Sequence, residues 1–179
     1  MREKLRRKLS GGDRRSTGRA DEVVRDVLAR PELFADLIEG LDDADPLVRM
    51  RCADAAEKVT REHPEYLLPH RRRCLQLLGQ SMEQEGRWHL AQMVPRLRLT
   101  RAECVTVVEA LFRCLADRSS IVRTLSMQAL ADLSANDSEL RARVLPLMEH
   151  LTVTGTPAMR ARGRRLLKQL RELDVRTGR

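Results

Sequence analysis

The chain of 179 residues is long enough for one compact domain, and 42% of its residues are hydrophobic but only 2% are aromatic. A core made mainly of Leu, Val, Ala and Met favours helices over strands. No stretch approaches the roughly 18 uninterrupted apolar residues that span a bilayer, and the opening segment MREKLRRKLSGGDRR lacks the apolar core of a secretory signal. We therefore expect a soluble cytoplasmic protein with no membrane span.

The formal net charge of +8 is concentrated at the two ends of the chain. Residues 1–20 and residues 158–179 each contain eight basic and two acidic side chains, which gives +6 at each end, so the 137 residues between them carry −4. Basic termini attract anionic partners, which are acidic protein surfaces, anionic membranes or nucleic acid.

Predicted helices alternate along the chain with short polar breaks, and they come in pairs. The first helix of each pair is predicted over residues 31–41, 64–79, 100–116 and 138–151. Thr100 and Glu103 have the spacing of a capping box at the start of the third of these. Pro69 and Pro146 lie inside the helical patterns, so we expect kinks or short first turns there. No segment alternates with period two, so no sheet is predicted.

The second helix of each pair has a small residue at its centre, and these small residues recur with a regular period. They are Cys52, Ala91, Ser126 and Gly163, separated by 39, 35 and 37 residues. Apolar residues three and four positions later, such as Ala55 and Ala56 or Ala129 and Leu130, lie on one face of each helix. An earlier copy centred on Ala20 would make five units, with atypical outer units acting as caps.

Two copies of this pattern resemble the second helix of HEAT repeats. In DPLVRMRCADAAEKV (residues 45–59) and DRSSIVRTLSMQALADL (residues 117–133), an acidic or turn residue is followed by Val-Arg and then by small and apolar residues. Residues 155–170 are a weaker copy. The resemblance is to HEAT-repeat domain proteins of the bacterial type. It implies an all-α fold, an α-solenoid or superhelix of about five stacked antiparallel helix pairs.

The resemblance also implies roles for two charged pairs and a division of the chain. Asp45 with Arg49, and Asp117 with Arg123, occupy positions that in this family bond along the stack. We expect three segments: a basic N-terminal arm outside the core over residues 1–12, a HEAT-like repeat domain over residues 13–173 and a C-terminal tail over residues 174–179.

No group of residues has the spacing of a catalytic or metal site. The histidines are scattered, without a Ser, Cys or paired carboxylate placed to act as nucleophile and base. The motifs GxxxxGK[ST], HExxH and GxSxG are absent. His70 and Cys74 are one helical turn apart, but a second pair of metal ligands is missing. We therefore expect no enzymatic activity, no cofactor and no metal.

The third copy of the repeat departs from the pattern, because Arg87 and Trp88 replace Val-Arg. Trp88 is the only tryptophan in the chain. Its indole, with His89 and Gln92 as polar neighbours, would form a platform for a partner's side chain. Alternatively it packs between helices, an interpretation that the scarcity of aromatic rings favours. Both interpretations stay open at this point.

Two functions suit such a repeat protein. We favour a non-enzymatic scaffold or adaptor that binds a partner protein or peptide on the concave surface formed by the second helices. An acidic partner would suit the basic chain. The residues expected on that surface are Met50, Asp54, Lys58, Arg61, Trp88, His89, Met93, Thr124, Gln128, Asp132 and Arg165.

The alternative function is nucleic-acid binding by a basic patch and the two basic termini. The residues expected in this patch are Arg71, Arg72, Arg73, Arg96, Arg98 and Arg101. Consecutive arginines on a helix point in different directions, and aromatic rings that would stack on bases are nearly absent. Both features disfavour nucleic-acid binding relative to the scaffold.

Overall fold

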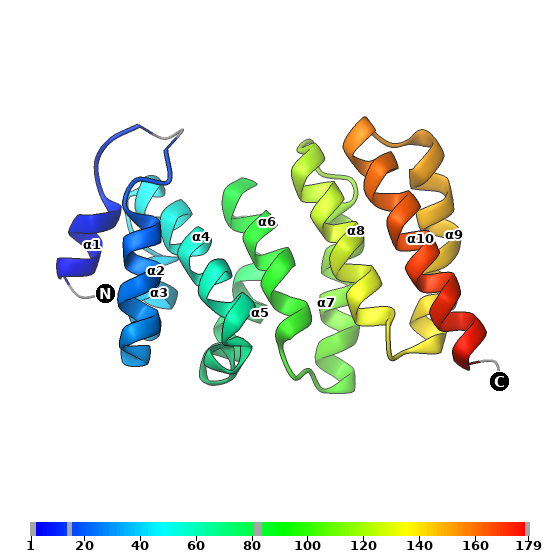
Figure 1. Ribbon diagram of the computed structural model, residues 1–179, viewed down its shortest axis with the longest axis horizontal. Helices are drawn as coiled ribbons and strands as arrows, with labels where there is room; N and C mark the ends of the chain where they lie inside the picture. Colours follow the sequence, from blue (N-terminus) through cyan, green and yellow to red (C-terminus); the bar gives the residue numbers. More distant parts are fainter. Residues whose placement is uncertain (1–2, 14–15, 81–83, 178–179) are drawn as a thin grey trace. The chain divides into compact units, whose positions relative to one another are not determined.

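A computed structural model describes residues 3–13, 16–80 and 84–177, without the side chains of residues 176 and 177. In these ranges the secondary structure is entirely helical and contains no strand (Figure 1). The predicted all-α fold without a sheet is therefore confirmed for the described residues. None of the helices in these ranges combines the length and the apolar character that a membrane-spanning segment needs. The chain divides into two compact units, residues 1–99 and residues 100–179.

The first unit is built from six α-helices and three short 3-10 segments among its described residues. In chain order they are α1 (Glu3–Leu9), α2 (Ala20–Ala29), η1 (Pro31–Leu33), α3 (Phe34–Gly40), α4 (Pro46–Glu62), η2 (Pro64–His70), α5 (Arg71–Gly79), α6 (Gln84–Met93) and η3 (Val94–Arg96). Helices α2, α4 and α6 run in the same direction as one layer, in which α4 contacts both of the others (Figure 1). Helices α3 and α5 lie behind this layer, against α4 and α6.

The small residues that set the predicted period are buried in this layer. Cys52 in α4 and Ala91 in α6 are both 0% exposed, and so are Ala20, Val23 and Val27 in α2. The early copy predicted at Ala20 is therefore a packed helix. Small and β-branched side chains at these positions let neighbouring helices approach closely.

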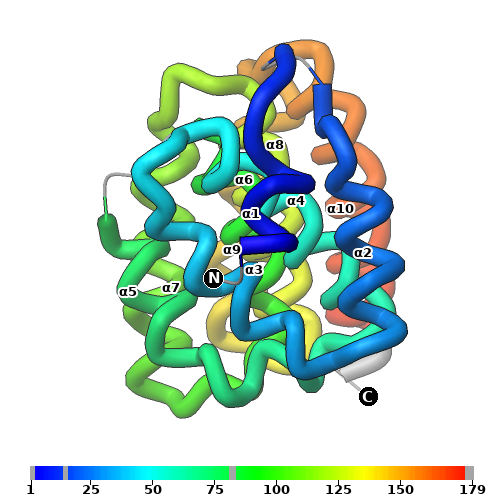
Figure 2. Tube along the Cα trace, turned by 90° about the vertical axis from the view of Figure 1, so that its left-hand side faces the viewer, coloured from blue at the N-terminus to red at the C-terminus, as the bar shows by residue number. Residues whose placement is uncertain are grey.

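The N-terminal segment belongs to the core of the first unit, contrary to the expectation that residues 1–12 form an arm outside it. Helix α1 packs against α2 and α4, and Figure 2 shows it beside α2. Leu5 and Leu9, one helical turn apart, are only 4% and 0% exposed. Arg6 binds Asp43, with 2.8 Å between Nε and Oδ2. Two leucines are therefore enough to anchor α1, and its basic side chains meet acidic neighbours.

The second unit consists of four helices among its described residues. They are α7 (Arg101–Cys114), α8 (Ser120–Ser134), α9 (Ser138–Thr154) and α10 (Pro157–Thr177). Helix α8 contacts α7, α9 and α10, and α10 also packs along α9. The predicted capping box at Thr100 and Glu103 is present at the start of α7. Helix α10 continues past residue 173, where we expected a tail to begin.

The two internal prolines act differently. Pro69 lies in the 3-10 segment η2, and the regular helix α5 begins only at Arg71, so the first helix of that pair has the expected irregular first turn. Pro146 instead lies inside α9, which is continuous from Ser138 to Thr154.

Equivalent turns precede α4 and α8. The Asp43 carboxylate accepts a hydrogen bond from the backbone N–H of Asp45, at 2.9 Å, and Asp117 accepts one from Ser119, at 2.8 Å. Asp45 and Ser119 in turn cap the N-termini of the two helices. Arg49 donates to the carbonyl of Asp43 at 2.6 Å. These contacts are local to the turn, and the bonds along the stack that the resemblance implies stay a prediction.

Gly163 marks a close approach of α10 to α9. A Cβ atom at this position would overlap Oγ1 of Thr152, and it would lie 3.2 Å from Cβ of Thr152 and 3.3 Å from Cε of Met127. The small residue that the repeat pattern placed here is thus required by the packing.

We expect Gly163→Ala to lower the free energy of unfolding by about 1–3 kcal/mol because the added methyl group overpacks this interface. The higher helix propensity of alanine, about 1 kcal/mol, offsets part of the loss. Urea denaturation followed by circular dichroism measures the change. Adding Thr152→Ala removes the overlapping hydroxyl and should restore part of the stability. Gly79→Ala is the matched control, because a Cβ there meets no atom within 4 Å. Wild-type stability of Gly163→Ala would contradict this packing.

Candidate partner-binding site

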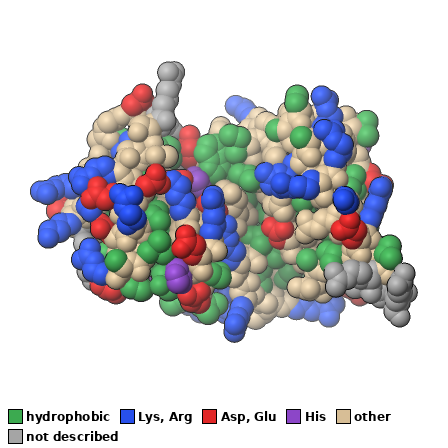
Figure 3. All heavy atoms as spheres, viewed as in Figure 1, with side chains coloured by type: hydrophobic (Ala, Val, Ile, Leu, Met, Phe, Trp, Pro, Cys, Tyr) green, Lys and Arg blue, Asp and Glu red, His purple; other side chains and the backbone are tan. Residues whose placement is uncertain are grey.

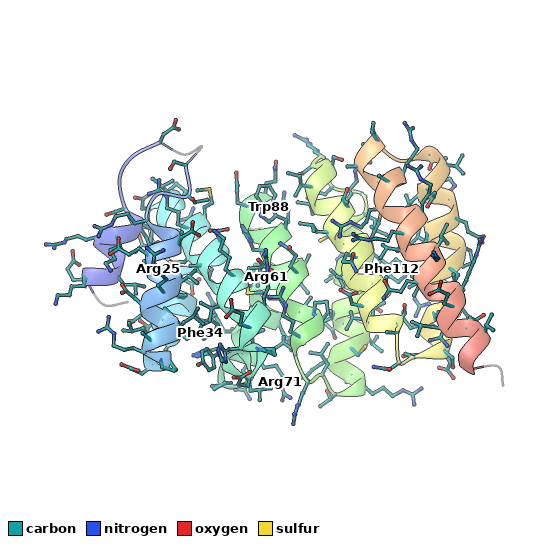
Figure 4. All side chains as sticks on the ribbon, in the orientation of Figure 1. Arg25, Phe34, Arg61, Arg71, Trp88 and Phe112 are labelled. Carbon is teal, nitrogen blue, oxygen red and sulfur yellow. The ribbon has the colours of Figure 1, made fainter. Side chains whose placement is uncertain are left out.

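A cavity of about 280 Å³ lies in the first unit between α4, α6 and the loop that precedes α2. It is lined by Ser16 and Thr17 of the loop, Met50, Arg51 and Asp54 of α4, and Glu85, Trp88 and His89 of α6. Figure 4 shows Trp88 near the N-terminal end of α6. Four of the residues predicted to bind a partner, Met50, Asp54, Trp88 and His89, therefore come together around one cavity.

Helical spacing explains why these residues share the cavity. Met50 and Asp54 are one turn apart on α4, and Glu85 precedes Trp88 and His89 by three and four positions on α6, so each set occupies one face of its helix. Because α4 and α6 run in the same direction and contact each other, their N-terminal halves meet at the same end of the unit.

Arg51 forms the floor of the cavity and holds the loop in place. Its side chain is buried, with 1% of the residue exposed. It donates hydrogen bonds to the carbonyls of Leu9 (2.8 Å), Gly11 (2.7 Å), Asp13 (3.1 Å) and Ser16 (3.1 and 3.2 Å). All five N–H groups of a guanidinium are thereby used. Arg51 therefore builds the wall of the site and has no donor left for a ligand.

The loop can approach Arg51 so closely only because it contains glycine. Gly18 has a φ of +56°, which favours glycine, and a Cβ there would lie 2.7 Å from Cζ of Arg51. Neither Arg51 nor Gly18 was predicted to take part in the site. The sequence feature that could have indicated this close-packed loop is its glycines at positions 11, 12 and 18. All three adopt a positive φ in the structure.

His89 lines the cavity and has one buried ring nitrogen that makes no hydrogen bond within the described part of the chain. The residue is 8% exposed, and within the described part of the chain Nδ1 has no hydrogen-bond partner. Burial lowers the pKa of His89 below its ordinary value of 6.5, against the opposing effect of Asp54 and Glu57, so the ring is neutral at pH 7. Its ring meets the edge of Trp88 at a centroid distance of 5.6 Å.

The carboxylates beside the cavity are partly neutralised by Lys58. Its Nζ is 2.8 Å from Oδ2 of Asp54 and 2.7 Å from Oδ1 of Asp21. Burial acts to lower the pKa of Lys58, but the hydrogen bonds to Asp21 and Asp54 outweigh it and the pKa is raised. Two negative charges and one positive charge leave this edge of the cavity with a net negative charge.

Two other residues predicted for this surface lie elsewhere. Met93 is 0% exposed and belongs to the core, so its assignment to the binding surface is wrong. Arg61 binds Glu57 on its own helix, with 2.5 Å between Nη2 and Oε2. Arg61 does not line the cavity, and Figure 4 shows it apart from Trp88.

The predicted basic patch is largely occupied by internal contacts. Arg96 donates to the carboxylate of the buried Glu57 at 2.6 Å and to the hydroxyl of Thr60 at 2.8 Å. Arg73 forms an ion pair with Asp42. These two arginines are therefore structural, which contradicts their place in a nucleic-acid patch.

The remaining patch residues are less engaged. Arg71 donates to the carbonyl of Arg98 at 3.0 Å, while the side chains of Arg72 and Arg98 are exposed. Arg101 belongs to the second unit, where its guanidinium lies 3.9 Å from Glu139.

In the second unit, three of the predicted surface residues form a hydrogen-bonded cluster. Oε1 of Gln128 accepts a hydrogen bond from Arg165 at 3.2 Å, and Nε2 of Gln128 donates to Asp132 at 2.8 Å. Arg162, which was not predicted, donates to the same Oε1 at 2.8 Å. Thr124 is 8% exposed and its hydroxyl donates to the carbonyl of Ser120, so it is turned toward its own helix.

Comparisons with known proteins identify the fold. No family model matches the sequence. No curated protein matches it either. The crystal structure of an engineered protein is similar with a TM-score of 0.65 and 15% identity, covering 94% of this chain and 78% of that chain. A designed armadillo repeat protein is similar with a TM-score of 0.58 and 16% identity, covering 93% and 80%. The predicted α-solenoid fold of helical repeats is thereby confirmed.

Proposed function

We propose that this helical-repeat protein is a non-enzymatic scaffold that binds a partner protein or peptide. The cavity between α4 and α6 receives a side chain of that partner. The observation that carries the proposal is one cavity that brings the half-buried indole of Trp88 together with His89, Met50 and Asp54. The Val-Arg pattern of α4 and α8 supports a HEAT-like type of repeat for this scaffold.

The size of the cavity favours a side chain over a cofactor. Sites for small molecules measure roughly 300–1,000 Å³, and the cavity of about 280 Å³ lies just below that range. Tryptophan is also enriched among the residues that dominate protein interfaces, because its large ring has a polar N–H at one edge. A partner side chain that stacks on Trp88 can reach His89 and the carboxylate of Asp54.

The polar groups of the cavity do not form a catalytic triad, although Ser16, His89 and Asp54 all line it. In a triad the base is oriented by a carboxylate that accepts the Nδ1–H hydrogen bond. Here Nδ1 of His89 has no partner in the described residues, and Oδ2 of Asp54 is paired with Lys58. This arrangement supports binding rather than catalysis.

Peptides selected from a random displayed library against the full chain test the proposal. We expect the selected peptides to change the emission of Trp88, since it is the only tryptophan and every shift reports on the cavity. Labelled peptides should lose at least about tenfold in affinity to Trp88→Ala or His89→Ala, which corresponds to about 1.4 kcal/mol.

Arg72→Ala is the control for this experiment, because Arg72 is exposed on α5 and does not line the cavity. It should bind the peptides as the wild type does, and circular dichroism should show the same helicity for all variants. Peptides that bind Trp88→Ala and His89→Ala with wild-type affinity would show that the partner docks elsewhere.

A further inference from the structure

Helix α10 carries five positive charges on exposed or half-buried side chains that form no ion pair with the described carboxylates. These residues are Arg160, Arg162, Arg164, Arg165 and Lys168. Among the described residues, none of these five forms an ion pair with an Asp or Glu side chain, and Arg160 donates to the carbonyl of Gly155. Figure 3 shows Lys and Arg side chains gathered over this part of the second unit. In the first unit, by contrast, Lys8, Lys58, Arg61, Arg73 and Arg96 all have carboxylate partners.

Two of these arginines converge on one neutral atom. Nη1 of Arg162 and Nη2 of Arg165 lie 2.8 and 3.2 Å from the same oxygen, Oε1 of Gln128. Burial and the charge of Arg165 lower the pKa of Arg162, and Asp132 opposes this effect. The amide oxygen accepts both hydrogen bonds but carries no charge, so the repulsion between the guanidinium groups persists.

The shape of the Gln128 amide indicates which chemical group of a partner could bind between Arg162 and Arg165. A side-chain amide has the planar shape of a carboxylate, and two guanidinium groups already meet where its oxygen lies. A carboxylate at this position would make charge-assisted hydrogen bonds, which are shorter and about twice as strong as neutral ones. The flexible side chain of Gln128 can yield to it, since its hydrogen bonds with Asp132 and Arg165 are solvent-exposed and only the one from Arg162 is partly buried.

We propose that the surface formed by α8 and α10 binds an acidic segment of a partner protein. One carboxylate of that segment takes the place of Oε1 of Gln128 between Arg162 and Arg165, and neighbouring carboxylates meet Arg164 and Lys168. This surface belongs to the second unit, whereas the cavity at Trp88 belongs to the first.

Two observations favour an acidic protein segment over nucleic acid. Helices α8 and α10 contain no aromatic residue on which a base could stack. The charged stretch from Arg160 to Lys168 spans only about 12 Å at the helical rise of 1.5 Å per residue, and the carboxylate of Asp132 adjoins it. Such a footprint fits a few carboxylates, whereas proteins that bind the phosphate backbone typically make about six to ten phosphate contacts.

Fluorescence anisotropy with a labelled oligo-glutamate peptide tests the proposal on the full chain. We expect binding at low salt that weakens as salt is added, and no binding of an oligo-glutamine peptide of the same length. Arg162→Glu and Arg165→Glu should each reduce the affinity by about ten- to a hundredfold, because each removes a charged hydrogen bond. Gln128→Glu should also weaken binding, since it places a carboxylate of the protein in the site.

Arg72→Glu is the matched control, because it makes the same change of net charge on an exposed arginine of the first unit. It should leave the affinity within about twofold of the wild type, because every residue of the surface formed by α8 and α10 is unchanged. An equal loss in Arg72→Glu and Arg162→Glu would show that only net charge matters and would overturn the proposal. So would the absence of peptide binding at low salt. Tighter binding of single-stranded or duplex DNA through Arg162 and Arg165 would replace the acidic segment with nucleic acid.

Discussion

Replacement of Arg51 by methionine is expected to lower the free energy of unfolding by about 3–5 kcal/mol, because it leaves several buried carbonyl groups without a hydrogen-bond donor. Methionine fills a similar volume but donates no hydrogen bond. The carbonyls of Leu9, Gly11, Asp13 and Ser16 then lose their donor, and each carbonyl left buried costs about 1–3 kcal/mol. The loss of unfolding free energy stays below the sum of these terms, because the loop can detach from α4 and its carbonyls can then form hydrogen bonds with water.

Hydrogen exchange distinguishes local detachment from global loss of stability. We expect the amides of residues 3–13 and 16–18 to exchange faster in Arg51→Met than those in the middle of α4. Arg51→Lys keeps the positive charge but replaces the planar guanidinium with an ammonium group that has fewer N–H donors. Its stability should therefore lie between those of the wild type and Arg51→Met. If Arg51→Met showed wild-type stability and exchange, the loop would be held by other contacts. Peptides that bind at Trp88 should also weaken in Arg51→Met, since the loop forms one wall of that cavity.

The repeat architecture was predictable because its signal is local. Cys52, Ala91, Ser126 and Gly163 are small residues at a regular spacing inside amphipathic helices, and all four are buried. A helix needs only residues three and four positions apart to define its buried face. The period of the pattern then indicates which faces repeat, without knowledge of any distant contact.

The roles of α1 and Arg51 could not be predicted in the same way. In the sequence, Arg51 is one of many arginines on helices, and its neighbours Cys52 and Ala53 define the buried face of α4. It is buried because Leu9, Gly11, Asp13 and Ser16 lie across α4 and turn their carbonyls toward it. A hydrogen bond from a side chain to the backbone of a distant loop leaves no periodic trace in the sequence.

The candidate cavity was predicted in part. The face that contains Met50, Asp54, Trp88 and His89 follows from helical spacing, and the structure brings these four together. Met93 was assigned to the same surface, but it is the last residue of α6 and is buried.

Arg96 was misplaced for a related reason. Pro95 lies in the 3-10 segment that follows α6, and this segment turns the chain so that Arg96 points back toward Glu57 of α4. The proline was visible in the sequence, but the direction of the chain after it depends on the packing of α4.

Glu57→Gln is expected to lower the free energy of unfolding by about 2–3 kcal/mol at pH 7, because hydrogen bonds to a charged group contribute about 1.5–3 kcal/mol. Glu57 is 1% exposed, and its carboxylate accepts hydrogen bonds from Arg61 and Arg96. The neutral amide leaves the partly buried Arg96 without its counter-charge. Arg61→Ala is the control with a smaller expected loss, below about 1 kcal/mol, since 59% of the Arg61 side chain is exposed.

The pH dependence of the Glu57→Gln effect gives an independent check of this network. Burial alone would raise the pKa of Glu57, but the hydrogen bonds from Arg61 and Arg96 outweigh it, so the pKa lies below its ordinary value of 4.5. The stabilisation by the carboxylate is therefore fully present above pH 4.5 and is lost as the pH falls through the folded-state pKa. Urea denaturation of both proteins should show a constant difference in stability from neutral pH down to about pH 4.5 and a shrinking difference below it. A difference that is independent of pH throughout the acidic range would mean that the charge of Glu57 does not contribute, and that the glutamine of the variant destabilises the protein only through its altered hydrogen-bonding geometry.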